Sequence, residues 1–250
     1  MRMNTFILNT IAFKEQLDRG ISQSKLVIPT VKLGFGAIEI RQEYLRDDQQ
    51  ELKEIADSAA ENGLAVYLSI NDNIIVDGKI NPQLSKYLRM MNDLGSSHLK
   101  MNIGPLTGVK PSFFVAELRK KLPSNCILTV ENNQTLADSK LSITRDFFKM
   151  LARNGIHNLH YCFDIANWSW LDATADEAAI DLAPVTTYLH LKNVDQQDGQ
   201  LTVTSLEEGR LDWRKLIDRF DNVTEYGFEY ASDAATLKND LSLVNKYLES

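Results

Sequence analysis

The sequence predicts a single (β/α)8 barrel that occupies residues 1–250. Short apolar runs alternate with longer amphipathic segments from one end of the chain to the other, which is typical of a parallel sheet with crossover helices. Eight such apolar runs can be counted, and 250 residues is about the usual length of one barrel of this kind. The alternative, an open doubly wound sheet, should have a glycine-rich phosphate-binding turn after its first strand, and none is present.

The eight predicted strands are short, apolar and separated by segments that could each form a helix. They cover residues 6–12, 37–42, 65–71, 98–103, 127–132, 159–165, 187–194 and 226–230. No linker, low-complexity tract or block of like charge divides them, so one domain is expected.

The predicted helices carry apolar residues at helical spacing. In residues 48–62, Leu52, Ile55 and Ala59 form one stripe, and Gly63 follows as a stop. Further helices are predicted over residues 82–94, 111–121, 144–153, 174–182, 212–220 and 232–248. The connection 13–30 has only a partial helical pattern.

Composition and charge restrict the partners. Hydrophobic residues make up 44% of the chain and the net charge is −7, so an acidic surface disfavours nucleic acid. Cys126 and Cys162 lie in apolar runs and are interpreted as buried thiols. No apolar run approaches the length of a membrane span and no signal peptide is recognised, so a cytoplasmic protein is expected. A homo-oligomer is compatible with the sequence.

Four potential metal ligands end the last four predicted strands: Glu131, Asp164, His190 and Glu229. The carboxyl ends of barrel strands meet at one mouth, where such enzymes carry their chemistry. A carboxylate at the end of an apolar strand is costly unless it is paired or binds a metal. One such residue is usually a cap or an ion-pair partner, but four on consecutive strands indicate a shared site.

Three carboxylates and one imidazole suit one divalent ion, with Mn²⁺, Mg²⁺ and Co²⁺ fitting best and Zn²⁺ a further candidate. The expected ligand is a small molecule that offers neutral hydroxyl and carbonyl oxygens. Five other residues are candidates for binding it: Lys192, Glu39, Arg41, Asn167 and Trp168. Four of them also have a structural alternative: an ion pair for Lys192, pairing of Glu39 with Arg41, and core packing for Trp168.

The segments around these residues read LTVENN, YCFDIANW, YLHLKNVD and YGFEY. They resemble the xylose-isomerase-like barrel superfamily, which includes sugar and sugar-phosphate isomerases and epimerases. The resemblance implies that Glu131, Asp164, His190 and Glu229 hold the metal and that Glu131 and Glu229 act as acid and base. It implies isomerisation or epimerisation of a sugar or sugar phosphate through a metal-stabilised enediolate.

The chain departs from the superfamily pattern at Asn167, where many epimerases have histidine. The DNA-repair branch needs several more histidines than the four in this chain, which argues against a nuclease. Two further readings keep the same site: a metal-dependent dehydratase of a cyclic polyol ketone, and a sugar-binding barrel without turnover.

Overall fold

The computed structural model describes residues 4–46 and 49–250, and its centre is a closed barrel of parallel strands. Its strands follow the order β1-β12-β9-β8-β7-β6-β3-β2, and β1 pairs with β2 to close the circle. The bounds are β1 Thr5–Asn9, β2 Ala37–Arg41, β3 Ala65–Asn73, β6 His98–Asn102, β7 Ile127–Glu131, β8 Leu159–Asp164, β9 Thr186–Leu191 and β12 Glu225–Phe228. The predicted (β/α)8 barrel is therefore confirmed, with each predicted strand in its place.

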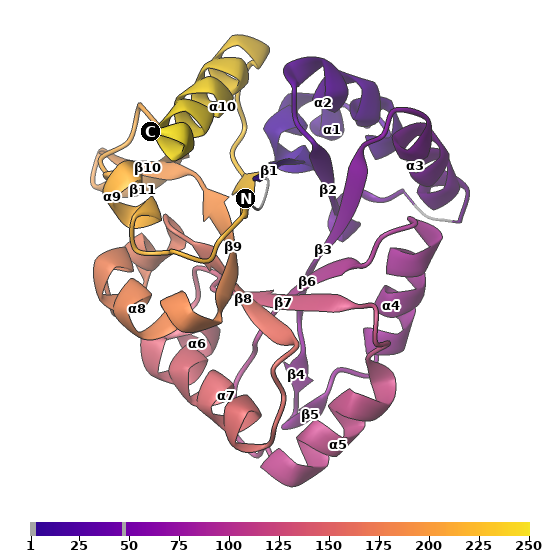
Figure 1. Ribbon diagram of the computed structural model, residues 1–250, viewed down its shortest axis with the longest axis vertical. Helices are drawn as coiled ribbons and strands as arrows, with labels where there is room; N and C mark the ends of the chain where they lie inside the picture. The colour runs from indigo at the N-terminus through magenta and orange to yellow at the C-terminus, as the bar shows by residue number, and fades with distance from the viewer. Residues whose placement is uncertain (1–3, 47–48) are drawn as a thin grey trace.

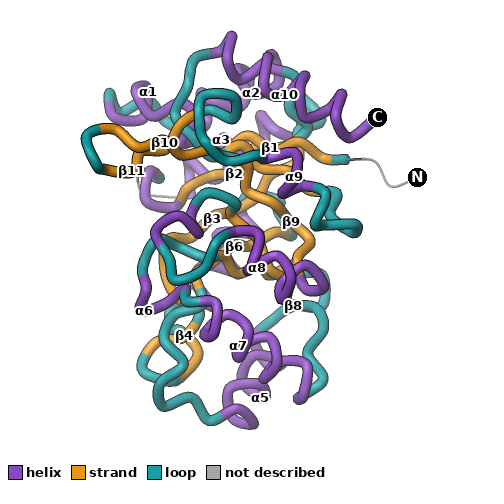
Figure 2. The backbone as a smooth tube through the Cα atoms, turned by 90° about the vertical axis from the view of Figure 1, so that its left-hand side faces the viewer, coloured by secondary structure: helices purple, strands orange, loops and turns teal. Residues whose placement is uncertain are grey.

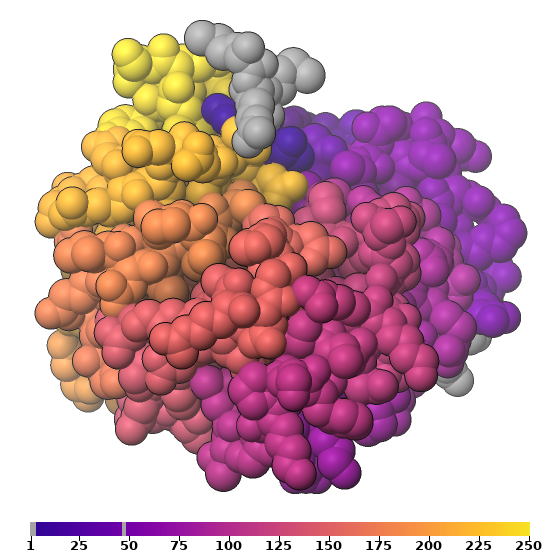
Figure 3. Space-filling view, turned by 60° about the horizontal axis from the view of Figure 1, so that its bottom comes forward, coloured from indigo at the N-terminus to yellow at the C-terminus, as the bar shows by residue number. Residues whose placement is uncertain are grey.

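Helices surround the barrel as an outer ring (Figure 1). They are α1 Lys14–Asp18, α2 Val27–Leu33, α3 Gln49–Glu61, α4 Leu84–Asp93, α5 Pro111–Lys121, α6 Leu136–Ser139, α7 Leu141–Arg153, α8 Ala175–Leu182, α9 Trp213–Ile217 and α10 Ala234–Glu249. Short 3-10 turns cover Thr10–Phe13, Gln23–Leu26, Gln42–Tyr44, Asn167–Trp170 and Ala183–Val185. Figure 3 shows the middle of the chain, from magenta to orange, covering one face in chain order.

Two hairpins were not expected from the sequence. One is β4 Ile75–Val76 with β5 Lys79–Ile80, and the other is β10 Asn193–Gln197 with β11 Gln200–Thr204. In Figure 2 β4 and the β10–β11 hairpin lie at one end of the barrel, and both chain termini lie at the other. The hairpins therefore belong to the loops at the carboxyl ends of the strands.

Some predicted boundaries were wrong. The first strand ends at Asn9 rather than residue 12, because the Asn9 side chain accepts a hydrogen bond from the Ile11 backbone and starts a 3-10 turn. The helix predicted over 144–153 begins at Leu141, and α6 precedes it. Position 48 of the helix predicted over residues 48–62 lies outside the described residues.

The main core lies between the strands and the helices, and a much smaller apolar cluster fills the barrel itself. In α3 the predicted stripe of Leu52, Ile55 and Ala59 is buried. The inner cluster consists of Ile7, Ala37, Tyr67, Cys162 and Tyr188. The next inward positions toward the carboxyl ends are polar, since strand side chains alternate with period two. Over the described residues, no helix is both long and apolar enough to span a membrane.

Candidate active site

Parallel pairing brings the four strand-end residues together. Glu131 and Asp164 end β7 and β8, His190 lies on β9, and Glu229 directly follows β12. Asp164 is in register with His190, and Glu131 is in register with Cys162. These three strands are neighbours, and β12 pairs with β9 on the other side, so the four side chains reach one mouth of the barrel.

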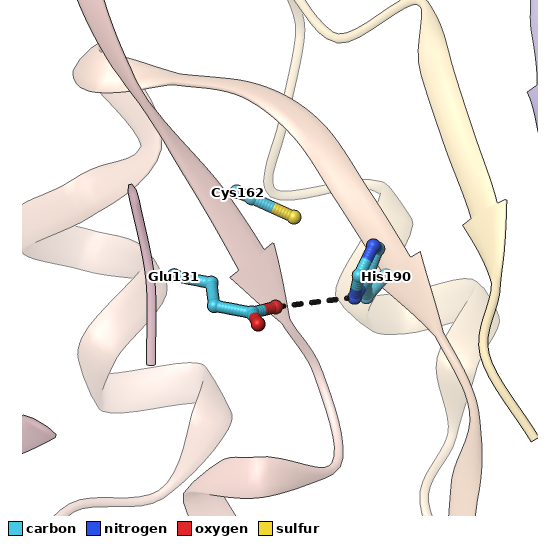
Figure 4. Close-up of side chains that lie close together, drawn as sticks. All are labelled: Glu131, Cys162 and His190. Atoms are coloured by element: carbon cyan, nitrogen blue, oxygen red, sulfur yellow. Dashed lines mark ion pairs between the residues drawn. The ribbon is translucent and has the colours of Figure 1, made fainter. Parts of the chain in front are cut away.

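His190 is at the centre of the group. Its Nδ1 atom lies 3.2 Å from Glu229 Oε2, 3.3 Å from Glu131 Oε2 and 3.9 Å from Asp164 Oδ2. Figure 4 shows Glu131 pointing toward this ring, with Cys162 beside them on β8. One imidazole nitrogen therefore faces carboxylate oxygens from three different strand ends.

Glu39 lies on the other side of the imidazole and is completely buried. Its Oε2 atom is 3.4 Å from His190 Nε2 and accepts a hydrogen bond of 2.7 Å from the Tyr188 hydroxyl. Its Oε1 atom accepts one of 2.7 Å from Asn9 Nδ2. Gly227 makes room for this arrangement, because a Cβ atom there would lie 2.4 Å from the Tyr188 hydroxyl. Glu39 therefore helps to fix the orientation of the His190 ring from the side opposite the other carboxylates.

Two buried lysines neutralise the carboxylates. Lys100 Nζ lies 2.8 Å from Glu131 Oε2 and 3.2 Å from Glu39 Oε1. Lys192 Nζ lies 2.7 Å from Asp164 Oδ2 and 2.8 Å from Glu229 Oε2. Each of the three carboxylate oxygens that face His190 Nδ1 therefore also has an ammonium group beside it.

Arg41 supplies a third cation. It donates to Glu229 Oε1 over 2.8 Å, and its Nε donates to Glu43 over 2.8 Å. The sequence favoured pairing of Arg41 with Glu39, but the two side chains point to different partners. Glu39 faces the barrel interior and Arg41 faces the mouth.

The two glutamates proposed as acid and base differ in their electrostatic surroundings. Burial raises the pKa of Glu131 above its ordinary value, and the charge of Lys100 only partly offsets this. Burial also acts to raise the pKa of Glu229, but the charges of Lys192, His190 and Lys100 outweigh it and hold that pKa well below its usual range. Opposite shifts in one site are the pattern expected of residues with different proton-transfer roles.

A cavity of about 430 Å³ opens above these groups, which is within the range of small-molecule sites. Its lining includes Glu131, Glu229, Lys192, Arg41 and five side-chain amides, those of Asn71, Asn102, Asn133, Gln134 and Asn167. An amide offers both donors and an acceptor, which suits a ligand with many hydroxyl groups.

The other predicted binding residues are placed differently. Asn167 lines the cavity, and its amide is held by the Asn132 carbonyl and the Gln134 side chain. Trp168 does not line this cavity: it packs in the core, with its ring centroid 5.6 Å from that of Phe163, and borders a second cavity. The indole directly after Asn167 points away from the mouth because successive side chains of a 3-10 turn lie about 120° apart.

The sequence reasoning missed several contributors. Strand alternation puts Lys100 and Asn102 on one face of the strand predicted over 98–103, and Asn71 ends the strand predicted over 65–71, but neither fact shows that these residues belong to this site. Asn133 and Gln134 follow Glu131 in the chain, and no periodic signal in the loop singled them out.

The donor atoms fit a hard divalent ion. Neighbouring ligands of an octahedral ion at about 2.1 Å lie roughly 3 Å apart, close to the separations around His190 Nδ1. Asp164 Oδ2 is buried and accepts no hydrogen bond of regular geometry, although Lys192 Nζ lies close to it. Two triplets of possible donors converge within 4.8 Å among the described residues: Glu39–His190–Glu229 and Glu131–Cys162–His190. Burial raises the pKa of Cys162 to about 12, so its thiol stays protonated and the oxygen donors are favoured.

No protein-family model matches the sequence, and no curated protein matches it. Solved structures do match in three dimensions. A xylose isomerase-like TIM barrel protein from Mycobacterium smegmatis in complex with magnesium is 15% identical, with a TM-score of 0.70, and the match covers 99% of this chain and 98% of that one. D-psicose 3-epimerase, in a structure with D-fructose, is 12% identical, with a TM-score of 0.69 and coverage of 98% and 100%.

A third match is a probable 3-DHS dehydratase, AsbF, from Bacillus anthracis. It is 16% identical, with a TM-score of 0.67, and the match covers 96% of this chain and 98% of that one. At these identities the likeness establishes the fold and nothing finer. The chain has the fold of the xylose isomerase-like TIM barrels.

Proposed function

We propose that this protein is a divalent-metal-dependent isomerase or epimerase of a sugar or sugar phosphate. The observation that carries the proposal is the convergence of three carboxylates on His190 Nδ1 beneath a cavity that is rich in amides and that Glu131 and Glu229 line. Solved structures of the same fold include an epimerase of D-psicose and a barrel with bound magnesium, which supports this chemistry.

Glu131, Asp164, His190 and Glu229 would hold the ion. When bound, a dication supplies Lewis-acid polarisation of a carbonyl and an adjacent hydroxyl, which acidifies the C–H bond between them. Manganese, magnesium and cobalt suit the oxygen-rich donor set, and zinc is a further candidate.

Glu131 and Glu229 are the proposed acid–base pair. Both line the cavity, and their strands β7 and β12 are separated in the barrel by β8 and β9. Two carboxylates on separate strands can reach a ligand from different sides. One removes the proton at the carbon next to the carbonyl, and the other returns a proton to the opposite face or to the next carbon.

The remaining cavity residues would bind and orient the ligand. The amides of Asn71, Asn102 and Asn167 match hydroxyl groups. Arg41 and Lys192 each contact Glu229, so they also fix the direction of that carboxylate.

A panel of ketoses and ketose phosphates in D2O tests the proposal. After chelator treatment, Mn²⁺ should restore both product formation and deuterium incorporation at the reacting carbon. Glu131→Gln and Glu229→Gln should each lower turnover by about 10² or more while the protein stays folded. Glu61→Gln, on the exposed end of α3, is the matched control and should keep full activity. Retained turnover in either site variant would remove that residue from the acid–base pair.

A dehydratase acting on a cyclic polyol ketone is the alternative. It shares proton removal next to a carbonyl, and the fold is also that of a probable dehydratase. The Lys192 ammonium beside Glu229 could protonate a departing hydroxyl group. Loss of that hydroxyl gives an enone, so ultraviolet absorbance separates this reaction from epimerisation. A sugar-binding barrel without turnover would instead bind panel members with neither product nor deuterium exchange.

A further inference from the structure

Lys192 shares its oxygen partners with the proposed ion. Its ammonium lies 2.7 Å from Asp164 Oδ2 and 2.8 Å from Glu229 Oε2. The same two oxygens are those that face His190 Nδ1. A carboxylate oxygen that ligates a dication closely cannot keep a full-strength ion pair with an ammonium group, because the two cations repel each other.

Charge in the site points the same way. Five carboxylates, those of Glu39, Glu43, Glu131, Asp164 and Glu229, face three permanent cations, those of Arg41, Lys100 and Lys192. Counted with the neutral imidazole that metal binding requires, the cluster carries two net negative charges, which one dication balances. The site can therefore hold a dication without excess charge, but the ammonium that shares the ligating oxygens has to move away from them.

The two lysines differ in whether their ammonium groups have room to move away from their carboxylate partners. Lys100 is 3% exposed and is held between Glu131 and Glu39 beneath the cavity. Lys192 lines the cavity, and its side chain is 8% exposed. Of the two lysines, only Lys192 has space beside it. Arg41 also lines the cavity, but it contacts Glu229 Oε1 and not the oxygens that face His190 Nδ1, so Lys192 is the cation that competes for those oxygens.

We propose that Lys192 is an internal counter-ion that competes with the divalent metal for Asp164 and Glu229. The inference rests on the proposed metal site and adds that Lys192 controls how tightly this site binds the metal. The ammonium stabilises the two carboxylates in the metal-free protein, and metal binding releases it from them. Removing the ammonium should therefore make metal binding tighter, whereas removal of a residue that only supported the site would weaken it.

Titration of the chelator-treated protein with Mn²⁺, followed by the resonance of free Mn²⁺, tests this directly. Lys192→Met should bind Mn²⁺ about tenfold more tightly than the wild type, which corresponds to the loss of one modest competing interaction. Lys14→Met is the matched control: Lys14 lines the same cavity but pairs with Asp18, so its removal should change the affinity less than about threefold. If Lys192→Met binds Mn²⁺ as tightly as the wild type or more weakly, the proposed competition between the Lys192 ammonium and the metal is refuted.

A second measurement uses the wild-type chain, so its outcome does not depend on how well the Lys192→Met variant folds. Acetylation of Lys192, read by mass spectrometry, should become faster when Mn²⁺ is added, because the ammonium leaves its carboxylate partners. If the protein binds Mn²⁺ but acetylation of Lys192 is slower or unchanged, the proposed release of Lys192 is refuted. That outcome leaves the proposed metal site itself standing. Absence of Mn²⁺ binding in both wild type and Lys192→Met would refute the metal-dependent function as well.

Discussion

Replacing Lys100 by methionine should destabilise the protein more than any loss of a surface lysine. The ammonium is 3% exposed and lies 2.8 Å from Glu131 and 3.2 Å from Glu39. Methionine fills a similar volume but leaves two buried carboxylates without their shared cation. Breaking a buried ion pair in this way typically costs about 3–5 kcal/mol. For a domain of this size, that corresponds to a fall in the melting temperature of roughly 6–20 °C.

The assay is urea denaturation of the metal-free protein at pH 7, monitored by tryptophan fluorescence and circular dichroism. Lys53→Met is the control, because Lys53 pairs with Asp57 on the surface and both side chains are mostly exposed. Such a pair contributes about 0–1 kcal/mol. A double variant that adds Glu39→Gln should lose less than the sum of its single changes, since it removes one of the stranded charges. A loss for Lys100→Met no larger than that of Lys53→Met would refute the electrostatic account of the barrel floor.

Three further outcomes are expected. Burial acts to raise the pKa of Glu39, but the charges of Lys100 and His190 outweigh it and lower that pKa from 4.5 to about 2. The stability that Glu39 contributes is therefore present above pH 4.5 and lost as the pH falls toward 2, so Glu39→Gln should flatten the acid limb of a melting-temperature profile. Gly227→Ala should cost about 1–3 kcal/mol in urea denaturation, because its methyl group would overlap the Tyr188 hydroxyl; an unchanged midpoint would show that Tyr188 can move aside. Mn²⁺ at about 100 times its dissociation constant should stabilise the wild type by about 2.7 kcal/mol in thermal denaturation and leave His190→Ala unaffected; equal shifts would place the ion elsewhere.

The sequence was sufficient for the barrel and for the residues at four strand ends. Apolar runs and helical stripes repeat strongly enough to fix the order of the strands, and barrel closure then fixes where Glu131, Asp164, His190 and Glu229 meet. This inference needs no side-chain detail, because parallel strands all end at the same mouth.

The ion pairs inside that mouth could not be predicted. Alternation along β6 shows that Lys100 and Asn102 share a face, but the partner of a long flexible ammonium depends on side chains from strands far away in the chain. Trp168 illustrates the opposite case, since its closeness to Asp164 in sequence was compatible with a ligand contact as well as with core packing. The 3-10 turn Asn167–Trp170 directs the indole into the core instead.

The β10–β11 hairpin was missed for a related reason. Its strands, NVDQQ and QLTVT, hold few apolar residues and are mostly exposed or half-buried, so no apolar run marks them in the sequence. The turn residues Asp198 and Gly199, both with positive φ, are the local signal that could have revealed it.

Both thiols of this chain are sealed behind packed side chains. Cys162 is completely buried in the inner apolar cluster, and Cys126 is 4% exposed. Burial raises the pKa of the Cys126 thiol to about 11, so neither sulfur is an effective nucleophile while the barrel is closed. Alkylation of Cys162 therefore requires the strands to separate. The rate at which a small haloacetamide modifies this thiol reports the frequency of that opening. Cys162 is thus an intrinsic probe of local opening in the native state, and it needs no added label.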